Sequence, residues 1–182
     1  NQDGKITEAD RKFIGDPNPT FTFGFNNVIT WKDFELSFFF NGSVGNDAYN
    51  YIRQQFSDPS SWGNRMKDVF DFARIALKDE NGSTTDISNV YISNASSAKV
   101  QRITQNPAND NNRVSSRFIE NASYLRLKSL SLSWNVPKKW LAPLKVDWVQ
   151  VYANVQNLFT ITNYKGYDPE LGSINQTVTL QG

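Results

Sequence analysis

The chain of 182 residues contains no cysteine and no histidine. Without cysteine it has no disulfide, no thiol nucleophile and no thiolate ligand for zinc. Without histidine it lacks the commonest general base and metal ligand of proteins. The sequence also lacks nucleotide-binding glycine motifs and the G-x-S-x-G nucleophile motif. We therefore predict that the chain is not an enzyme and needs no cofactor, apart from the calcium ion considered below.

Long apolar runs and an excess of charge are missing too. No stretch approaches the ~18 consecutive apolar residues of a membrane helix. The formal net charge is +1 and the basic residues are scattered, which argues against a nucleic-acid partner. The mean hydropathy of −0.54 is polar. It does not exclude membrane strands, because these alternate lipid-facing apolar residues with polar ones.

Aromatic residues make up 14% of the chain, and many of them lie in alternating patterns. Apolar side chains occupy every second position of four segments, which are 21–31, 34–41, 124–136 and 148–161. A period of two predicts β-strands with one apolar face. The segments have 8 to 14 residues, close to the ~9–11 of a tilted membrane strand and longer than the ~5–6 of soluble strands. We expect lipid to contact Phe21, Phe23, Phe25, Leu130, Leu132, Val149 and Val151.

The connections between these segments alternate between short and long. Two residues join the first pair of segments, about 80 residues follow, and about 11 join the second pair. Transmembrane barrels have short periplasmic turns and long extracellular loops. Tryptophans at the short-turn ends agree with an interfacial girdle: Trp31, Trp134, Trp140 and Trp148. The alternative is that these rings line the edge of a soluble β-sandwich.

We therefore predict an all-β chain, an antiparallel transmembrane β-barrel segment with long extracellular loops. Four strands cannot close a barrel, and unpaired strand edges are not tolerated in lipid, so the strands must pair with strands outside this sequence. The expected divisions are an extracellular loop at 1–19, a barrel hairpin at 20–41, a long extracellular loop at 42–122, a second hairpin at 123–161 and an extracellular loop at 162–182 that lacks the barrel closure.

The long loop carries its own patterns. Apolar residues at helical spacing over 66–77 predict a short amphipathic helix that ends near Gly82. The alternative is a strand of a hairpin that turns at 79–82. We expect a short strand at 87–92 and irregular structure over 105–116.

Aromatic and polar residues at the start of this loop suggest carbohydrate binding. Rings stack on the C–H faces of sugars, and amides, carboxylates and guanidinium groups bond the hydroxyls. The candidate residues are Tyr49, Tyr51, Trp62 and Arg65. The alternative is that these rings pack the loop against its neighbours.

The first ten residues resemble the second half of an EF-hand calcium loop. Gly4 would form the sharp turn, and hard oxygen ligands suit Ca²⁺. The expected ligands are Asn1, Asp3, the Lys5 carbonyl and Asp10. The first ligand position is missing and the last is Asp in place of Glu, so a tight Asp-Gly turn without an ion is the alternative.

Four motifs, in order, resemble SusC/RagA-type TonB-dependent outer-membrane transporters, in the C-terminal part of their barrel. They are D-G-K-I-T-E-A-D-R with I-G-D-P-N-P (3–11, 14–19), F-N-G-S-V-G-N-D (40–47), R-F-I-E-N-A-S-Y-L-R-L-K (117–128) and V-Y-A-N-V-Q-N-L-F-T with G-Y-D-P-E (151–160, 166–170). Together they cover most of the chain, whereas residues 60–112 match weakly.

This resemblance implies a 22-stranded barrel with an internal plug in the outer membrane of a Gram-negative bacterium. It implies energy from the TonB complex, a SusD-like surface lipoprotein as partner, and oligosaccharide or sometimes peptide cargo. The plug, the TonB-contacting segment and the closing strand are not in this sequence, and no initiator Met precedes Asn1, so we expect a fragment. The alternative function is a soluble β-sandwich carbohydrate-binding module.

Overall fold

The computed structural model describes residues 7–60, 62–104 and 111–170. It separates into two units. The sheet unit comprises residues 15–48 and 119–170, and the loop unit comprises residues 7–14 and 49–118 of the described chain.

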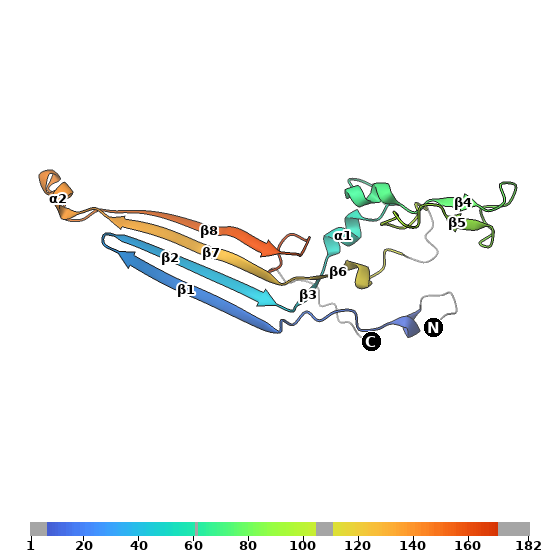
Figure 1. The fold of residues 1–182 in the computed structure, drawn as a ribbon, viewed down its shortest axis with the longest axis horizontal. Coiled ribbons are helices and arrows are strands. Elements are labelled where there is room, and N and C mark those ends of the chain that lie inside the picture. The colour runs from blue at the N-terminus through green and yellow to red at the C-terminus, as the bar shows by residue number, and fades with distance from the viewer. Residues whose placement is uncertain (1–6, 61, 105–110, 171–182) are drawn as a thin grey trace. The chain divides into compact units, whose positions relative to one another are not determined.

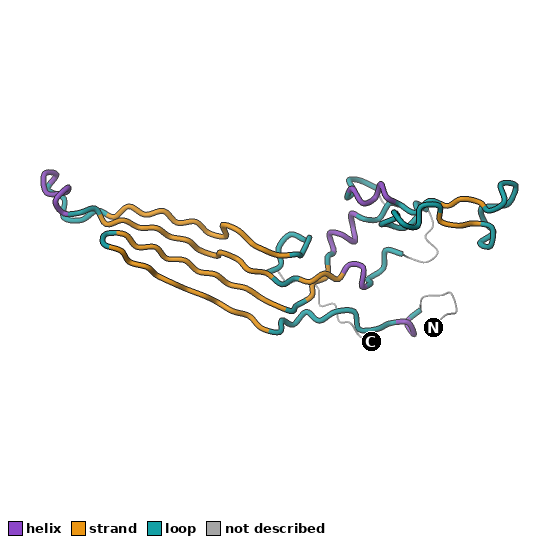
Figure 2. The backbone as a smooth tube through the Cα atoms, in the orientation of Figure 1, coloured by secondary structure: helices purple, strands orange, loops and turns teal. Residues whose placement is uncertain are grey.

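The sheet unit is built on four antiparallel strands (Figures 1 and 2). In spatial order they are β1 (Phe21–Trp31), β2 (Phe34–Val44), β7 (Tyr124–Asn135) and β8 (Gln150–Thr162). All four predicted strands are confirmed, and β2 continues three residues beyond the predicted end. The turn Lys32–Asp33 joins β1 to β2, with Lys32 at φ 54°. β1 and β8 are the edge strands.

Side-chain alternation gives this sheet one apolar face. The register pairs Phe25 with Phe40, Leu36 with Leu132, and Leu132 with Ala153, so apolar residues align across all four strands. Many of these side chains are exposed, including Phe21 at 52% and Val151 at 56%. The predicted lipid-facing residues within the strands share this face, and Val149 lies directly before β8. A β-sandwich would bury such a face between two sheets, so the sandwich alternative loses its support.

A β-bulge in β7 keeps the apolar face continuous. The apolar residues of β7 are Leu125, Leu127, Leu130, Leu132 and Trp134, which change from odd to even numbers in mid-strand. Lys128 is an extra residue at this point, because Leu127 pairs with Phe40 while Ser129 pairs with Phe39. An extra residue shifts the alternation by one position. Both halves of the strand therefore direct their large apolar side chains to the same face.

Aromatic rings line the short-turn end of the sheet. The Phe34 ring stacks between Trp31 and Trp134, with centroid distances of 6.4 and 6.0 Å. Trp140 meets Trp134 edge-on at 5.7 Å. Trp140 belongs to the single-turn helix α2 (Lys138–Leu141), which the 3₁₀ turn η4 (Ala142–Leu144) follows. Three of the four predicted girdle tryptophans thus join one ring cluster, and Trp148 is exposed just before β8.

The loop unit consists of short elements. They are η1 (Glu8–Asp10), α1 (Tyr51–Phe56), η2 (Lys67–Asp71), β4 (Ile75–Leu77), β5 (Val90–Ile92) and η3 (Ser116–Phe118). The short strand β3 (Asp47–Tyr49) pairs with β6 (Ile119–Asn121). No helix in the described ranges is both long and apolar enough to cross a membrane.

The helix predicted over 66–77 is wrong beyond Asp71, where the 3₁₀ helix η2 ends, and the hairpin alternative is confirmed for residues 75–77. β4 pairs antiparallel with β5, which lies within the strand predicted at 87–92. The Asn94 side chain accepts a bond from the Arg74 N–H (2.8 Å) and donates to the Phe72 carbonyl (2.9 Å). These bonds hold the chain extended before β4. A short isolated helix is marginal in water, so such tertiary bonds decide the local structure.

The face assignment predicts a difference between two neighbouring positions of β7. Leu130→Arg should lower the free energy of unfolding in lipid by about 2–4 kcal/mol, because it places a charge on the apolar face at mid-strand. Ser131→Arg places the same charge on the opposite face and should cost less than about 1 kcal/mol. Urea titration of the lipid-embedded protein, followed by heat-modifiable gel migration, measures both. Equal losses would contradict the assignment.

Candidate functional site

The second face of the sheet is polar. Residues that alternate with the apolar side chains are mostly small and uncharged, and they include Thr22, Asn26, Thr30, Ser37, Ser129, Ser131, Ser133, Asn154 and Gln156. Phe39, Tyr124 and Tyr152 are large residues on this face. The Phe39 ring packs over Gly24, 3.2 Å from the position that a Cβ atom would take there. Hydroxyl and amide groups along this face suit a surface that meets water.

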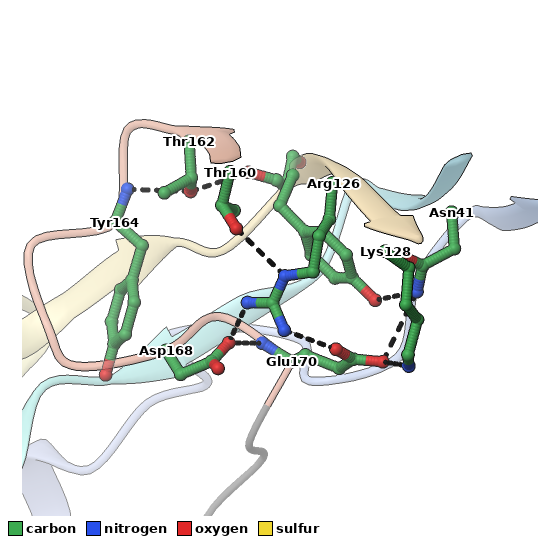
Figure 3. A network of polar contacts seen from close by, with 10 residues as sticks. Asn41, Arg126, Lys128, Thr160, Thr162, Tyr164, Asp168 and Glu170 are labelled. Carbon is green, nitrogen blue, oxygen red and sulfur yellow. Dashed lines mark hydrogen bonds and ion pairs between the residues drawn. The ribbon is translucent and has the colours of Figure 1, made fainter. Parts of the chain in front are cut away.

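A cluster of charged residues lies on this polar face at the long-loop end of the strands (Figure 3). Arg126 of β7 is its centre, with a side chain that is only 8% exposed. Its guanidinium donates to the Thr160 hydroxyl (2.8 Å), to the Glu170 carboxylate (2.5 Å) and to the Asp168 carboxylate. All of its nitrogens therefore have an acceptor, as a buried guanidinium requires.

Lys128 and Asn41 complete the cluster. The Lys128 ammonium donates to Glu170 Oε1 at 2.6 Å, and the Asn41 amide donates to the same atom at 3.3 Å. Lys128 can reach this site because it is the extra residue of the bulge, which places it beside Ser129 on the polar side of β7. The bulge thus serves both the apolar face and the charged cluster.

The two carboxylates belong to the segment that follows β8, residues 163–170, which we call the return loop. It folds back over the polar face so that its last residues meet β7 (Figure 3). Its start is held as well, because the Tyr164 N–H donates to Thr162 Oγ1 (3.1 Å) and the Lys165 N–H donates to Glu120 (3.0 Å). Asp168 Oδ1 also accepts from the Glu170 N–H (2.9 Å), which fixes the turn that presents both acids.

Charge is balanced within the cluster, since Arg126 and Lys128 face Asp168 and Glu170. The hydrogen bond from Lys128, followed by the two nearby positive charges, lowers the pKa of the Glu170 carboxyl. All four charged groups are engaged with one another, which leaves no free nucleophile or base. The arrangement can anchor a loop, and it offers no catalytic chemistry.

The structure divides the four carbohydrate-binding candidates. Tyr49 is half-buried and its ring packs edge-on against Phe118 at 6.3 Å. Burial, and to a lesser extent the nearby Tyr51, raises the pKa of the Tyr49 hydroxyl. Arg65 is also half-buried, and it donates to the Asn64 carbonyl (3.1 Å). Tyr51 and Trp62 are exposed, at 48% and 98%. Tyr49 thus packs within the loop unit, as the alternative to carbohydrate binding expects, whereas Trp62 is open to solvent.

The calcium prediction falls mostly outside the described residues, because Asn1, Asp3 and Lys5 lie there. Asp10 is described, and its carboxylate accepts the Thr7 N–H (2.9 Å) at the start of η1. Within the described ranges no three acidic side chains gather into a metal-binding group. The calcium site stays a prediction.

Sequence reasoning missed the charged cluster. Arg126 and Lys128 lie in one of the motifs that carry the resemblance, and Asp168 and Glu170 lie in another, but nothing in either motif states that the two meet. One signal was available, namely two cations within a strand of otherwise uncharged residues.

Comparison with known proteins agrees with this geometry. The chain is 35% identical over 92% of its length to TonB-dependent receptor P3 of Formosa agariphila, of which it covers 14%. It is 26% identical over 95% of its length to TonB-dependent receptor SusC of Bacteroides thetaiotaomicron, of which it covers 15%. A solved structure of the RagAB peptide transporter matches 92% of the chain with a TM-score of 0.66 and 27% identity, and 17% of that chain is covered. No family model matches the sequence.

Long antiparallel strands with a continuous, exposed apolar face define a segment of transmembrane β-barrel wall. The relatives specify the family: the chain belongs with the SusC/RagA-type TonB-dependent receptors. It spans 14–17% of the length of the relatives described above.

Removal of Arg126 should release the return loop. Loss of one partner of a buried ion pair costs about 3–5 kcal/mol, and the partial exposure of the two acids reduces this to about 2–3 kcal/mol. A spin label on a cysteine introduced at the exposed Tyr167 should become mobile in Arg126→Ala. Lys165→Ala, an exposed change in the same loop, is the matched control and should leave the label restrained. A restrained label in Arg126→Ala would disprove the anchoring role.

Loop anchoring should also depend on acidity. Because the folded-state pKa of Glu170 is lowered, its contribution is complete above the ordinary value of about 4.3 and is lost as the pH falls through the lowered pKa. The label at position 167 should therefore stay restrained from neutral pH down to the ordinary glutamate value, and it should become mobile only as the pH falls further, through the lowered pKa. In Glu170→Gln the part of this transition due to Glu170 should vanish. An unchanged transition in that variant would refute the assignment.

Proposed function

We propose that the chain is part of an active importer in the outer membrane of a Gram-negative bacterium, which takes up oligosaccharides or peptides with energy from TonB. The observation that carries this proposal is the continuous apolar face of four long strands, joined to the similarity with TonB-dependent receptors. The sheet supplies barrel wall, with the apolar face toward lipid and the polar face toward the lumen.

The orientation follows from the connections. The turn at 32–33 and the turn with α2 lie at the periplasmic end, and residues 45–123 lie outside the cell. The charged cluster and the return loop are then at the extracellular mouth of the lumen. A return loop anchored by ion pairs keeps that mouth in a defined shape.

The importer works with a SusD-like surface lipoprotein and contacts TonB through another part of the protein. The similarity to SusC and to RagAB supports the lipoprotein partner, and the name of RagAB, a peptide importer, supports peptide as one cargo class. We propose oligosaccharides as the other cargo class, because the chain is similar to SusC and the long loop carries exposed aromatic residues.

Within the long loop we assign cargo contact to Trp62 and Tyr51, because their rings are exposed. Tyr49 and Arg65 support the loop from half-buried positions. If calcium binds, Asn1, Asp3, the Lys5 carbonyl and Asp10 are the ligands, and the ion orders the approach to β1.

The membrane assignment is tested with the protein expressed in a Gram-negative host. It should remain with the outer membrane during detergent fractionation and should migrate faster on gels before boiling than after it, since intact barrels resist unfolding by detergent. Recovery in the soluble periplasmic fraction would reject the proposal.

Cargo contact is tested by calorimetry with oligosaccharides and peptides on the assembled importer. Trp62→Ala should weaken binding of the true cargo by about 1–2 kcal/mol, which is roughly 5- to 30-fold. Tyr167→Ala removes another exposed ring, 90% accessible, and should leave the affinity unchanged. Equal affinity in both variants would remove Trp62 from the site.

A further inference from the structure

The short-turn end of the sheet carries a group of exposed lysines, which we call the basic turn cluster. Its members are Lys32 in the β1–β2 turn and Lys138, Lys139 and Lys145 in the connection from β7 to β8. All four side chains are exposed. Three acids at this end oppose the four lysines, Asp33 and Asp147 in the two turns and Glu35 at the start of β2. None of the four lysines forms an ion pair in the part of the chain that the structure describes. This end of the sheet is therefore positive.

Exposed apolar side chains lie among these lysines. They are Trp31 (64% exposed), Trp140 (57%), Leu144 (70%), Val146 (41%) and Trp148 (64%). The ring contacts from Trp31 through Phe34 and Trp134 to Trp140 connect the two turns, and the Lys32 ammonium lies 4.9 Å from the centre of the Trp31 ring. α2, which contains Lys138, Lys139 and Trp140, lies at the tip of the connection (Figure 1). Lysines and partly exposed aromatic rings thus occur together at the short-turn end of the strands.

We propose that the basic turn cluster binds the headgroups of anionic phospholipids in the leaflet at the short-turn end, with the neighbouring aromatic rings at the headgroup level. The inference rests on the proposed function, because it needs the sheet to lie in a membrane. Tryptophan and lysine favour this interface for different reasons, the ring because it is amphipathic and the ammonium because it is attracted to phosphate charge.

The opposite end of the same sheet supplies a contrast. There Arg126 and Lys128 are neutralised by Asp168 and Glu170, so these cations have no capacity left for a lipid phosphate. Among the described residues of the sheet unit, the short-turn end has four lysines outside any ion pair beside several exposed rings, whereas the long-loop end has one such lysine, Lys165. The anionic-lipid preference is therefore expected from one end of the strands.

The test uses the complete transporter in lipid nanodiscs that contain phosphatidylglycerol and phosphatidylcholine in equal amounts. Native mass spectrometry counts the lipids that stay bound. The wild type should retain phosphatidylglycerol in preference, and the preference should fall at high salt. In the triple variant Lys138→Gln, Lys139→Gln, Lys145→Gln it should drop at least about tenfold, because each lysine near an anionic surface contributes roughly fivefold. The corresponding arginine variant should retain it.

A matched control removes three exposed lysines elsewhere in the chain, Lys12→Gln, Lys67→Gln and Lys165→Gln. This control should keep the wild-type preference. Equal loss in both triple variants, or no preference in the wild type, would overturn the inference while the membrane assignment stands. Failure of the wild type to enter nanodiscs of any composition would instead reject the proposed function.

Discussion

A backbone that crosses hydrocarbon has no water to bond, so every N–H and C=O must find its partner in a neighbouring strand. The rest of the sheet unit depends on this condition. It requires strands of membrane-crossing length, and it requires partners for the outer edges of β1 and β8. It also limits where irregularity is tolerated. The bulge at Lys128 lies toward the long-loop end of β7, where a lysine side chain can turn to the polar face.

The ion-paired charges and the aromatic ring cluster of this sheet lie at opposite ends of the strands. Paired charges gather at the long-loop end of the polar face, around Arg126, where burial makes each ion pair stronger than it would be in water. Aromatic rings gather at the short-turn end, around Phe34. Between these ends the strands carry mainly apolar side chains on one face and serine, threonine or asparagine on the other.

The strands could be predicted from the sequence because alternation is a local signal. Phe21 to Trp31 and Leu130 to Trp134 each reveal a face without knowledge of any partner. The bulge was also readable, from the change of leucine positions at Lys128, but it was not used. The contact between Arg126 and Glu170 was beyond local reasoning, because 44 residues separate them. The hairpin β4–β5 shows the same limit, since the side chain of Asn94, distant in sequence, decides whether residues near 74 are helical or extended.

The two ends of the long loop between β2 and β7 affect how quickly the sheet can form. Closing a flexible loop of about 80 residues costs about 1.5 kcal/mol more in entropy than closing one of about 14, the length of the β7–β8 connection. Two backbone bonds shorten the effective path, from Asn50 N–H to the Phe118 carbonyl (2.7 Å) and from Ala122 N–H to the Asn46 carbonyl (2.8 Å). Once these two bonds have closed the long loop, β2 and β7 can pair as if only a few residues joined them. The effective loop that must close before β2 and β7 pair is then much shorter than their separation in sequence. Pairing of the two hairpins therefore becomes a nearly local event.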